Sequence, residues 1–287
     1  MSEKFCLQLT LSDNAKSIAE KDLNETEENV KNALIQLKEL LENDKTIYYK
    51  IDDEFLKIFL RPCKFYATSA YELMKRIANF RAKYKTLLYD LVPSQERDAI
   101  VNHNLINVLP DRDQLGRRVM IVYCGENWNT SKVSSDQIFR LFYLIHLLAI
   151  LEPDTQINGT VVIMDYKGMG LKQVAALTPA FSMKLLGFIQ DAMPLRLKEI
   201  HMVNNPWIFK TVWAVFKPFI KEKLGKRIHF HENKMPSLHK FIDKSYLPKN
   251  YGGDLPEINY GGKEWYPVME KHIDHIKEWN TYGLVEK

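Results

Sequence analysis

The sequence predicts an α/β protein in which an all-helical N-terminal bundle precedes a mainly parallel β-sheet with crossover helices. Two observations carry this prediction. Residues 1–93 show helical apolar spacing, whereas from residue 117 onward short β-branched runs alternate with apolar helical segments. Such alternation is typical of a parallel sheet, because each parallel pair of strands needs a crossover connection. With 287 residues, of which 46% are hydrophobic, the chain is long enough for two small domains or one large core with a helical annex.

The N-terminal region is expected to contain three helices. The first begins with acidic residues and then places leucines at helical spacing, and the second stops at Pro62 because proline cannot continue a helix. A third, longer helix follows. The expected helices are residues 24–43, 52–61 and 68–90. Pro93 marks a break, so residues 1–93 are assigned to an N-terminal helical domain.

The next region is expected to alternate strands with helices. The expected strands are residues 117–124, 158–168, 197–204 and 227–232, and the expected helices are residues 135–151, 171–192, 207–227 and 236–243. Pro179 and Pro218 are expected to interrupt two of these helices. We assign residues 94–255 to this second domain. Residues 256–287, which contain a glycine pair and several aromatic residues, are expected to form an irregular tail that ends in a short helix.

Positive charge is concentrated in one part of the chain. Residues 196–227 contain eight basic and two acidic residues, a net charge of +6, so the rest of the chain carries −2 of the total of +4. The first fifty residues, with ten acidic residues and seven lysines, carry −3. The positive field therefore lies in one region. Its basic residues alternate with bulky aliphatic residues rather than with base-stacking aromatics, which disfavours nucleic acid as a partner.

The same region contains an unusually apolar segment, residues 207–227. Wound as a helix, it spreads nine apolar side chains over half of its circumference, whereas a helix that only covers a sheet needs a stripe of about 100°. Lys210, Lys217 and Lys221 follow one flank. One interpretation is a core helix with a solvated lysine edge. The other is an apolar surface with a cationic rim that suits an anionic membrane, where each basic residue contributes on the order of 1 kcal/mol.

The chain lacks the common catalytic motifs of α/β enzymes. It contains no GxxxxGK[ST] phosphate loop, no GxGxxG fingerprint and no GxSxG nucleophile elbow. His229 and His231 face the same side of an expected strand, but no third metal ligand lies at a suitable spacing, and half-buried histidines are the ordinary interpretation. We therefore expect no catalytic residue, no metal and no cofactor, and interpret the chain as a non-enzyme.

The expected location is the cytoplasm, with reversible binding to membranes. The first residues lack the long apolar segment of a secretory signal, and the longest apolar stretch, residues 141–151, is too short to span a bilayer. Three cysteines, an odd and sparse set, do not suggest a disulfide framework and fit a reducing compartment.

Five segments form a pattern through their order and spacing: residues 52–65, 109–119, 158–168, 193–231 and 247–254. Taken together, they resemble the CRAL-TRIO lipid-binding family, in the branch of α-tocopherol transfer and retinaldehyde-binding proteins. The resemblance covers residues 25–255. It implies a helical N-terminal bundle followed by an α/β domain that encloses a hydrophobic pocket. It also implies non-catalytic transfer of one hydrophobic molecule between membranes, with residues 206–220 as a mobile lid segment over the pocket.

The resemblance further implies a phosphoinositide site. In the tocopherol-transfer branch, basic residues of the PLKxR and KPFxxxKxxxR motifs hold the head group, and Arg196, Lys198, Lys217, Lys223 and Arg227 match them here. We add Lys221 to this expected membrane-binding set because it follows the same flank of the lid segment. One corner departs from the family pattern: the second arginine of FLRAR is replaced by Cys63. The other interpretation of these basic residues is solvated surface charge.

By position in the family, the expected pocket residues come from a helix, a strand, a second helix with its turn, and the lid segment. They are Phe139, Phe142, Tyr143, His146, Val162, Met164, Leu185, Phe188, Ile189, Met193, Leu195, Val212, Phe216 and Ile220. Tyr143 and His146 are the candidates for orienting a ligand hydroxyl or carbonyl. Ordinary core packing is the alternative for each of these residues.

The expected ligand is a tocopherol, retinoid, carotenoid, other isoprenoid, sterol or fatty acyl lipid. Burial of its apolar surface would drive binding, at about 25 cal/mol per Å². The competing hypothesis is a phosphoinositide-sensing module that is recruited to membranes without a tightly held cargo.

Overall fold

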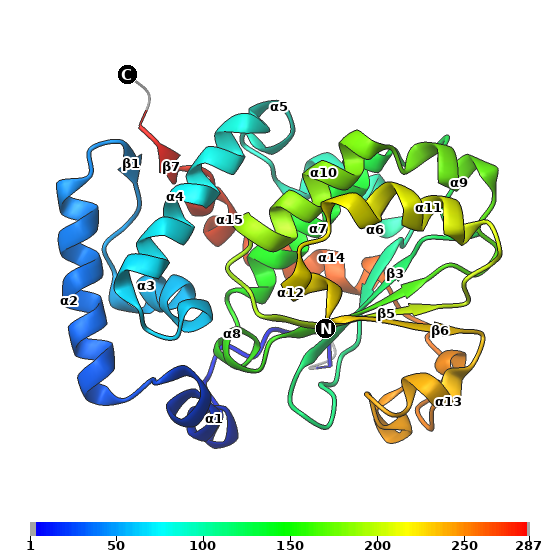
Figure 1. Cartoon of the computed structure of the whole chain (residues 1–287), viewed down its shortest axis with the longest axis horizontal. Helices are drawn as coiled ribbons and strands as arrows, with labels where there is room; N and C mark the ends of the chain where they lie inside the picture. Colours follow the sequence, from blue (N-terminus) through cyan, green and yellow to red (C-terminus); the bar gives the residue numbers. More distant parts are fainter. Residues whose placement is uncertain (1–3, 286–287) are drawn as a thin grey trace.

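The computed structural model describes residues 4–285, and it confirms the expected α/β architecture. Figure 1 shows the N-terminal helices on one side and, beside them, a five-stranded sheet covered by helices. The N-terminal helices are α1 (Asp13–Leu23), α2 (Glu27–Asn43), α3 (Asp53–Leu60), α4 (Ala67–Lys83) and the short α5 (Lys85–Leu88). The sequence predicted α2 and α3, and it predicted one helix over residues 68–90 that the structure divides at Tyr84 into α4 and α5; it did not predict α1. Ser12 caps α1 by accepting a hydrogen bond from the Ala15 amide.

The central sheet has the strand order β2-β3-β4-β5-β6, and only β2 runs antiparallel to its neighbour. The strands are β2 (Ile106–Val108), β3 (Arg118–Tyr123), β4 (Thr160–Asp165), β5 (Leu197–Val203) and β6 (Ile228–Glu232). The four parallel strands lie where the sequence predicted them. Strand β2 was not predicted, because three residues are too few to show alternation.

Helices connect the parallel strands across one face of the sheet (Figure 1). They are α7 (Ser135–Ala149), α8 (Pro153–Asn158), α9 (Leu171–Ala176), α10 (Pro179–Gly187), the π-helical turn η3 (Phe188–Ala192), α11 (Phe209–Phe216), η4 (Lys217–Phe219) and α12 (Glu222–Gly225). Pro179 starts α10, and Pro218 lies in η4, so both prolines interrupt helices as expected. Short helices η2 (Pro93–Glu96) and α6 (Arg97–Val101) precede the sheet, and α13 (Met235–Leu238) follows β6.

The strands pack against a separate core on each face of the sheet. Alternate strand residues belong to a small cluster beneath α13 and the following turns, which comprises Leu109, Val119, Ile121, Val161, Ile163, Val203, Leu238, Ile242, Leu247 and Tyr251. The opposite face joins a much larger cluster that also contains α7, α10 and the N-terminal helices. We call these the α13 face and the α7 face.

The last thirty residues differ from the expected irregular tail. They form α14 (Gly262–Lys271), α15 (Ile273–Asn280) and β7 (Gly283–Leu284), and β7 pairs with β1 (Ile47–Tyr48) in the N-terminal region. Trp279 is 1% exposed and stacks on Phe59 of α3, with ring centroids 5.9 Å apart. The segment is therefore a structural strap between the two parts of the fold. Its glycine pair and aromatic residues suggested an irregular tail that ends in a short helix. A short helix, α15, is present near the end, but Trp265, Val268 and Met269 have the helical spacing of a further helix, α14.

Candidate functional site

An internal cavity of about 130 Å³ lies on the α7 face of the sheet. Strand residues form its floor: Ile106, Val108, Met120, Val162, Met164, Leu197 and Ile200. Helical residues form its other walls: Leu141, Phe142, Ile145, Leu148, Ala149, Leu185, Phe188 and Ile189. The lining is almost entirely apolar, as in sites that take a hydrophobic ligand.

Alternation along β4 explains which of its side chains face the cavity. Val162 and Met164 point to the cavity, whereas Val161 and Ile163 between them belong to the α13-face cluster and are 0% exposed. The strand is apolar on both faces, as expected of a buried parallel strand. One sheet therefore supports a solid core on one side and a void on the other.

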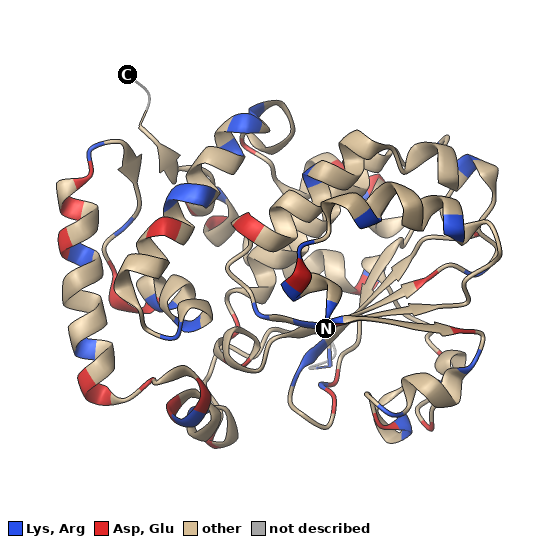
Figure 2. Ribbon diagram, viewed as in Figure 1, with Lys and Arg blue, Asp and Glu red and all other residues tan. Residues whose placement is uncertain are grey.

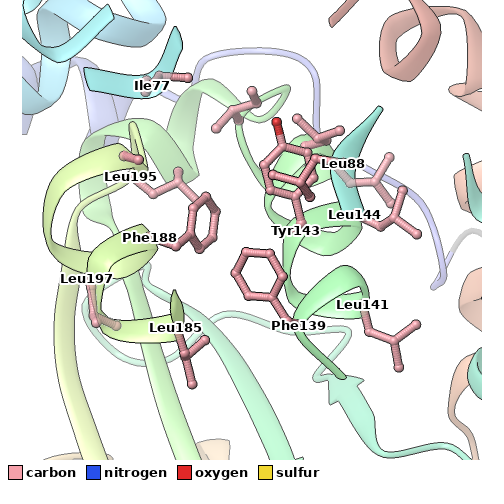
Figure 3. Close-up of a cluster of buried hydrophobic side chains, with 14 of the residues drawn as sticks. Ile77, Leu88, Phe139, Leu141, Tyr143, Leu144, Leu185, Phe188, Leu195 and Leu197 are labelled. Atoms are coloured by element: carbon pink, nitrogen blue, oxygen red, sulfur yellow. The ribbon is translucent and has the colours of Figure 1, made fainter. Parts of the chain in front are cut away.

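Nine of the fourteen expected pocket residues line this cavity: Phe142, His146, Val162, Met164, Leu185, Phe188, Ile189, Met193 and Leu195. Phe139 and Tyr143 do not. Phe139 is buried among aromatic rings, and its ring centroid lies 5.8 Å from that of Phe188. Figure 3 shows these two side chains facing each other between α7 and the next helical segment. The Tyr143 hydroxyl accepts a hydrogen bond of 3.1 Å from Nε1 of Trp279. Trp279 of the C-terminal strap therefore binds the Tyr143 hydroxyl.

The three expected lid residues, Val212, Phe216 and Ile220, also lie outside the cavity lining. Phe216 packs against Phe181 of α10, with ring centroids 6.3 Å apart, and α10 is the helix that contributes Leu185 to the lining. Val212 is buried, whereas Phe216 and Ile220 are half-buried. The lid segment is therefore one layer away from the cavity.

Several residues that line the cavity were not among the predicted pocket residues. Gly262, Trp265 and Met269 come from α14, and Leu7 comes from the segment before α1. The helical spacing in residues 262–271 was the available signal for α14. No local pattern indicates Leu7, because the chain reaches the cavity through long-range contacts: the Gln8 amide donates to Glu152 (3.0 Å), and the Ser12 amide donates to Asp154 (3.0 Å).

A buried ion pair forms part of the cavity lining. Arg118 donates to Glu152 through Nε (3.1 Å) and to the carbonyl of Pro110 through Nη1 (2.8 Å). The Glu152 carboxylate also accepts from Thr155 (2.7 Å) and lies 3.2 Å from Arg112. Burial raises the pKa of Glu152, but the neighbouring Arg118 and Arg112 outweigh it, and the net shift is downward. This carboxylate is therefore ionised and fully paired.

His146 is the other polar side chain on the helical wall. Its Nδ1 contacts the carbonyl oxygen of Tyr143 in the preceding turn, and its ring lies edge-on to Phe188 at 4.8 Å. Burial lowers the pKa of His146 to about 3, although the Tyr143 carbonyl opposes this effect. The imidazole is therefore neutral at physiological pH.

The expected basic residues form two groups. Arg196, Lys198 and Arg227 are half-buried beside one another, and desolvation lowers the pKa values of Arg196 and Lys198, with Asp22 opposing and Arg227 adding to the effect. Lys217 and Lys223 are exposed on the lid side. Figure 2 shows basic residues on α11, which lies over the α/β region, and on α12 near the middle of the view.

Two further members of this surface have partners. Lys221 pairs with Asp191 at 2.5 Å, so its charge is partly neutralised. Cys63 stands where the family pattern has a second arginine. Burial raises the pKa of its thiol to about 11, against the opposing effects of Arg76 and Lys223. The thiol is therefore uncharged, and the guanidinium of Arg76 lies close enough to act on it.

Within residues 4–285, no group of three or more His, Cys, Asp or Glu side chains is arranged to hold a metal ion. Within the described residues, no two cysteines form a disulfide bond. In the same range, no helix has both the length and the apolar character needed to cross a bilayer.

Comparison with known proteins gives consistent matches. A model of the CRAL/TRIO domain matches residues 102–253. The mouse protein "Alpha-tocopherol transfer protein-like" (Mus musculus) is 34% identical over 230 residues, which cover 80% of this chain and 66% of that protein, just under two thirds of its length. Clavesin-1 of Rattus norvegicus is 31% identical over 261 residues, which cover 89% of this chain and 72% of that protein. Among solved structures, that of Sfh5 is similar with a TM-score of 0.49 at 16% identity, covering 92% of this chain and 99% of the other.

Proposed function

The chain belongs to the CRAL/TRIO domain family, and from this premise we propose that it is a non-catalytic cytosolic carrier of one hydrophobic small molecule. The observation that carries the proposal is the apolar cavity between α7 and the sheet. Burial of apolar ligand surface there would supply the binding energy, at about 25 cal/mol per Å². Among the described residues that line the cavity, no nucleophile lies beside a general base, which supports carriage rather than catalysis.

The cavity's size limits the cargo. At about 130 Å³ it is smaller than the roughly 300 Å³ or more that sites for drug-sized ligands occupy. Four flexible methionines, Met120, Met164, Met193 and Met269, border it, and methionine side chains adapt readily to a new occupant. A slender acyl or isoprenoid chain therefore fits the proposal better than a rigid sterol, and entry of a larger lipid requires these side chains to rearrange.

The second part of the proposal is reversible docking to an anionic membrane through the lid side. Trp207, which is 83% exposed, precedes α11, and Leu171, which is 76% exposed, begins the neighbouring helix α9. Tryptophan prefers the membrane interface, and basic residues beside it add electrostatic attraction. Docking would move the lid segment, α10 would follow because the two pack together, and the cavity would open for exchange.

We further propose that a phosphoinositide head group binds at Arg196, Lys198, Lys217, Lys223 and Arg227, with Lys221 at the edge of the site. Arg76 would supply the cation that Cys63 does not. Its Nε donates to the carbonyl of Asp191 (3.1 Å), which holds the guanidinium beside this surface. In the division proposed for the chain, residues 1–93 form the helical domain and residues 94–255 the carrier domain. The C-terminal residues then serve as part of the cavity wall, through α14.

The test is native mass spectrometry of freshly purified full-length protein, followed by solvent extraction and identification of the released lipid. The carrier proposal expects one hydrophobic molecule per chain. Protein that carries no lipid, takes up none from vesicles and still floats with phosphoinositide vesicles would instead support the sensing module. Turnover of the extracted lipid on prolonged incubation would contradict the non-catalytic assignment.

A further inference from the structure

The polar groups around the cavity differ in whether they are available to a ligand. Arg118 and Glu152 satisfy each other, and their remaining hydrogen-bonding positions are taken by the Pro110 carbonyl, the Gln8 amide and Thr155. The Thr160 hydroxyl can either donate or accept, so it selects no particular head group. His146 remains as the polar group with a fixed hydrogen-bonding role.

The tautomer of His146 follows from its neighbour. A carbonyl oxygen only accepts hydrogen bonds, so the contact with Tyr143 places the ring proton on Nδ1. The ring is neutral, so Nε2 carries a lone pair and no proton. Among the described residues, none donates a hydrogen bond to this Nε2. The Tyr143 hydroxyl accepts a hydrogen bond from Nε1 of Trp279, and within the described residues no hydrogen bond joins this hydroxyl to Nε2 of His146.

We infer that the cavity selects a lipid alcohol, whose hydroxyl donates a hydrogen bond to Nε2 of His146. This inference rests on the proposed carrier function and names its ligand class. A buried acceptor without a donor is unfavourable, so a ligand that brings a hydroxyl proton gains affinity there. An aldehyde, ester or ether oxygen presents only lone pairs to Nε2, and these repel it.

An ionised fatty acid is disfavoured for a second reason. Its carboxylate would need a cation, but the guanidinium of Arg118 is already neutralised by Glu152. A buried carboxylate without a partner is strongly unfavourable. For ligands that share one hydrocarbon chain, the cavity therefore favours the alcohol and disfavours the aldehyde and the ionised acid.

The experiment compares hexadecanol with its methyl ether and with hexadecanal, three probes that share one chain. Binding to the full-length protein is followed by quenching of tryptophan fluorescence, since Trp265 lines the cavity. We expect hexadecanol to bind about 5- to 10-fold more tightly than the ether, the gain of one neutral hydrogen bond. Equal affinities would overturn the inference while leaving the carrier proposal intact. Failure of all three probes to bind, together with absence of extracted lipid, would overturn the carrier proposal itself.

Two variants locate the effect. His146→Phe keeps an aromatic ring but removes the acceptor, so the alcohol and the ether should bind equally. His146→Gln offers an amide NH₂ that can donate, so hexadecanal should gain affinity relative to wild type. An alcohol preference that persists in folded His146→Phe, verified by thermal unfolding, would place the selecting group elsewhere and contradict the assignment. If His146→Phe does not fold, the wild-type ratio of alcohol to ether still decides the question.

Discussion

The two faces of the central sheet are built from alternate residues of the same strands, but they differ in what covers them. On the α13 face, Val161 and Ile163 meet a small, filled cluster that short local segments close. On the α7 face, Val162 and Met164 meet helices that leave a cavity. Residues 161–164 of β4 are apolar on both faces, so the void is a property of what covers the sheet. Function in this molecule therefore depends on how the covering helices are held apart.

The two coverings differ in where they come from along the chain. The α13 face is closed by residues that follow β6 directly, and the Tyr251 hydroxyl there donates to Asp165 at 3.1 Å. The α7 face is supported by the N-terminal helices and by the C-terminal strap. Side chains that line a void lose packing contacts on that side. The helices that cover the α7 face therefore depend more on the elements packed against their outer surface.

The largest effect is expected from removing that support. Trp279→Ala deletes an indole that stacks on Phe59 and donates to Tyr143, on the side of α7 that faces away from the cavity. We expect a loss of about 3–5 kcal/mol in the free energy of unfolding, together with loss of retained lipid. Chemical denaturation measures the first, and mass spectrometry of the purified protein measures the second. Trp279→Phe is the control, since it keeps the stacking, and it should retain most of the stability. A loss under 1 kcal/mol for the alanine variant would mean that the strap does not support the hollow face.

A matched pair of substitutions compares the faces directly. Val161→Ala opens a new hole in the filled cluster and should cost about 2 kcal/mol, without altering the lipid that the protein retains. Val162→Ala only enlarges an existing void, so it should cost about 1 kcal/mol and admit bulkier ligands. Urea unfolding and lipid extraction report the two quantities. Equal costs and unchanged ligand selection in both variants would contradict the distinction between the faces.

Acid should affect the α13 face through a histidine that the cavity does not use. Nε2 of His231 lies 2.9 Å from Nδ1 of His201, and its Nδ1 lies 2.9 Å from Ser237. Burial, followed by the neighbouring His201 and His229, lowers the pKa of His231 to about 4. Above pH 6.5 the group is neutral in both the folded and the unfolded state. Between pH 6.5 and about 4 the unfolded state binds a proton that the folded state does not, so stability falls as the pH is lowered.

For His231 this loss should reach about 3 kcal/mol by pH 4. Unfolding of wild type and of His231→Gln, measured at pH 7.5 and at pH 4.5, isolates the contribution. The variant should lose less stability on acidification than wild type does. Identical pH dependence of the two proteins would show that His231 is not the responsible group.

The sequence specified the sheet better than it specified the cavity. The run from Val161 to Met164 predicts a buried strand, and its alternation predicts two faces, because both are local properties. Helical spacing likewise places Phe139, Phe142, Tyr143 and His146 on one side of α7. It does not indicate which of them borders a void, because that depends on where η3 and the C-terminal strap lie. The pairing of β1 with β7 joins the two ends of the chain, and no local pattern encodes it.

The smallest effect on stability, and a large effect on transfer, is expected from surface charge. Lys217→Glu combined with Lys223→Glu reverses two exposed charges on the lid side and should change the free energy of unfolding by less than about 0.5 kcal/mol. Each basic residue near an anionic membrane contributes on the order of 1 kcal/mol, so lipid transfer between phosphoinositide vesicles should slow about tenfold. The matched control is Lys240→Glu combined with Lys249→Glu, which reverses two exposed charges on the α13 side. If docking uses the lid side, the control variant transfers lipid at the wild-type rate. Slowing of both variants to the same extent would indicate a general effect of net charge, and it would remove the link between the hollow face and the membrane.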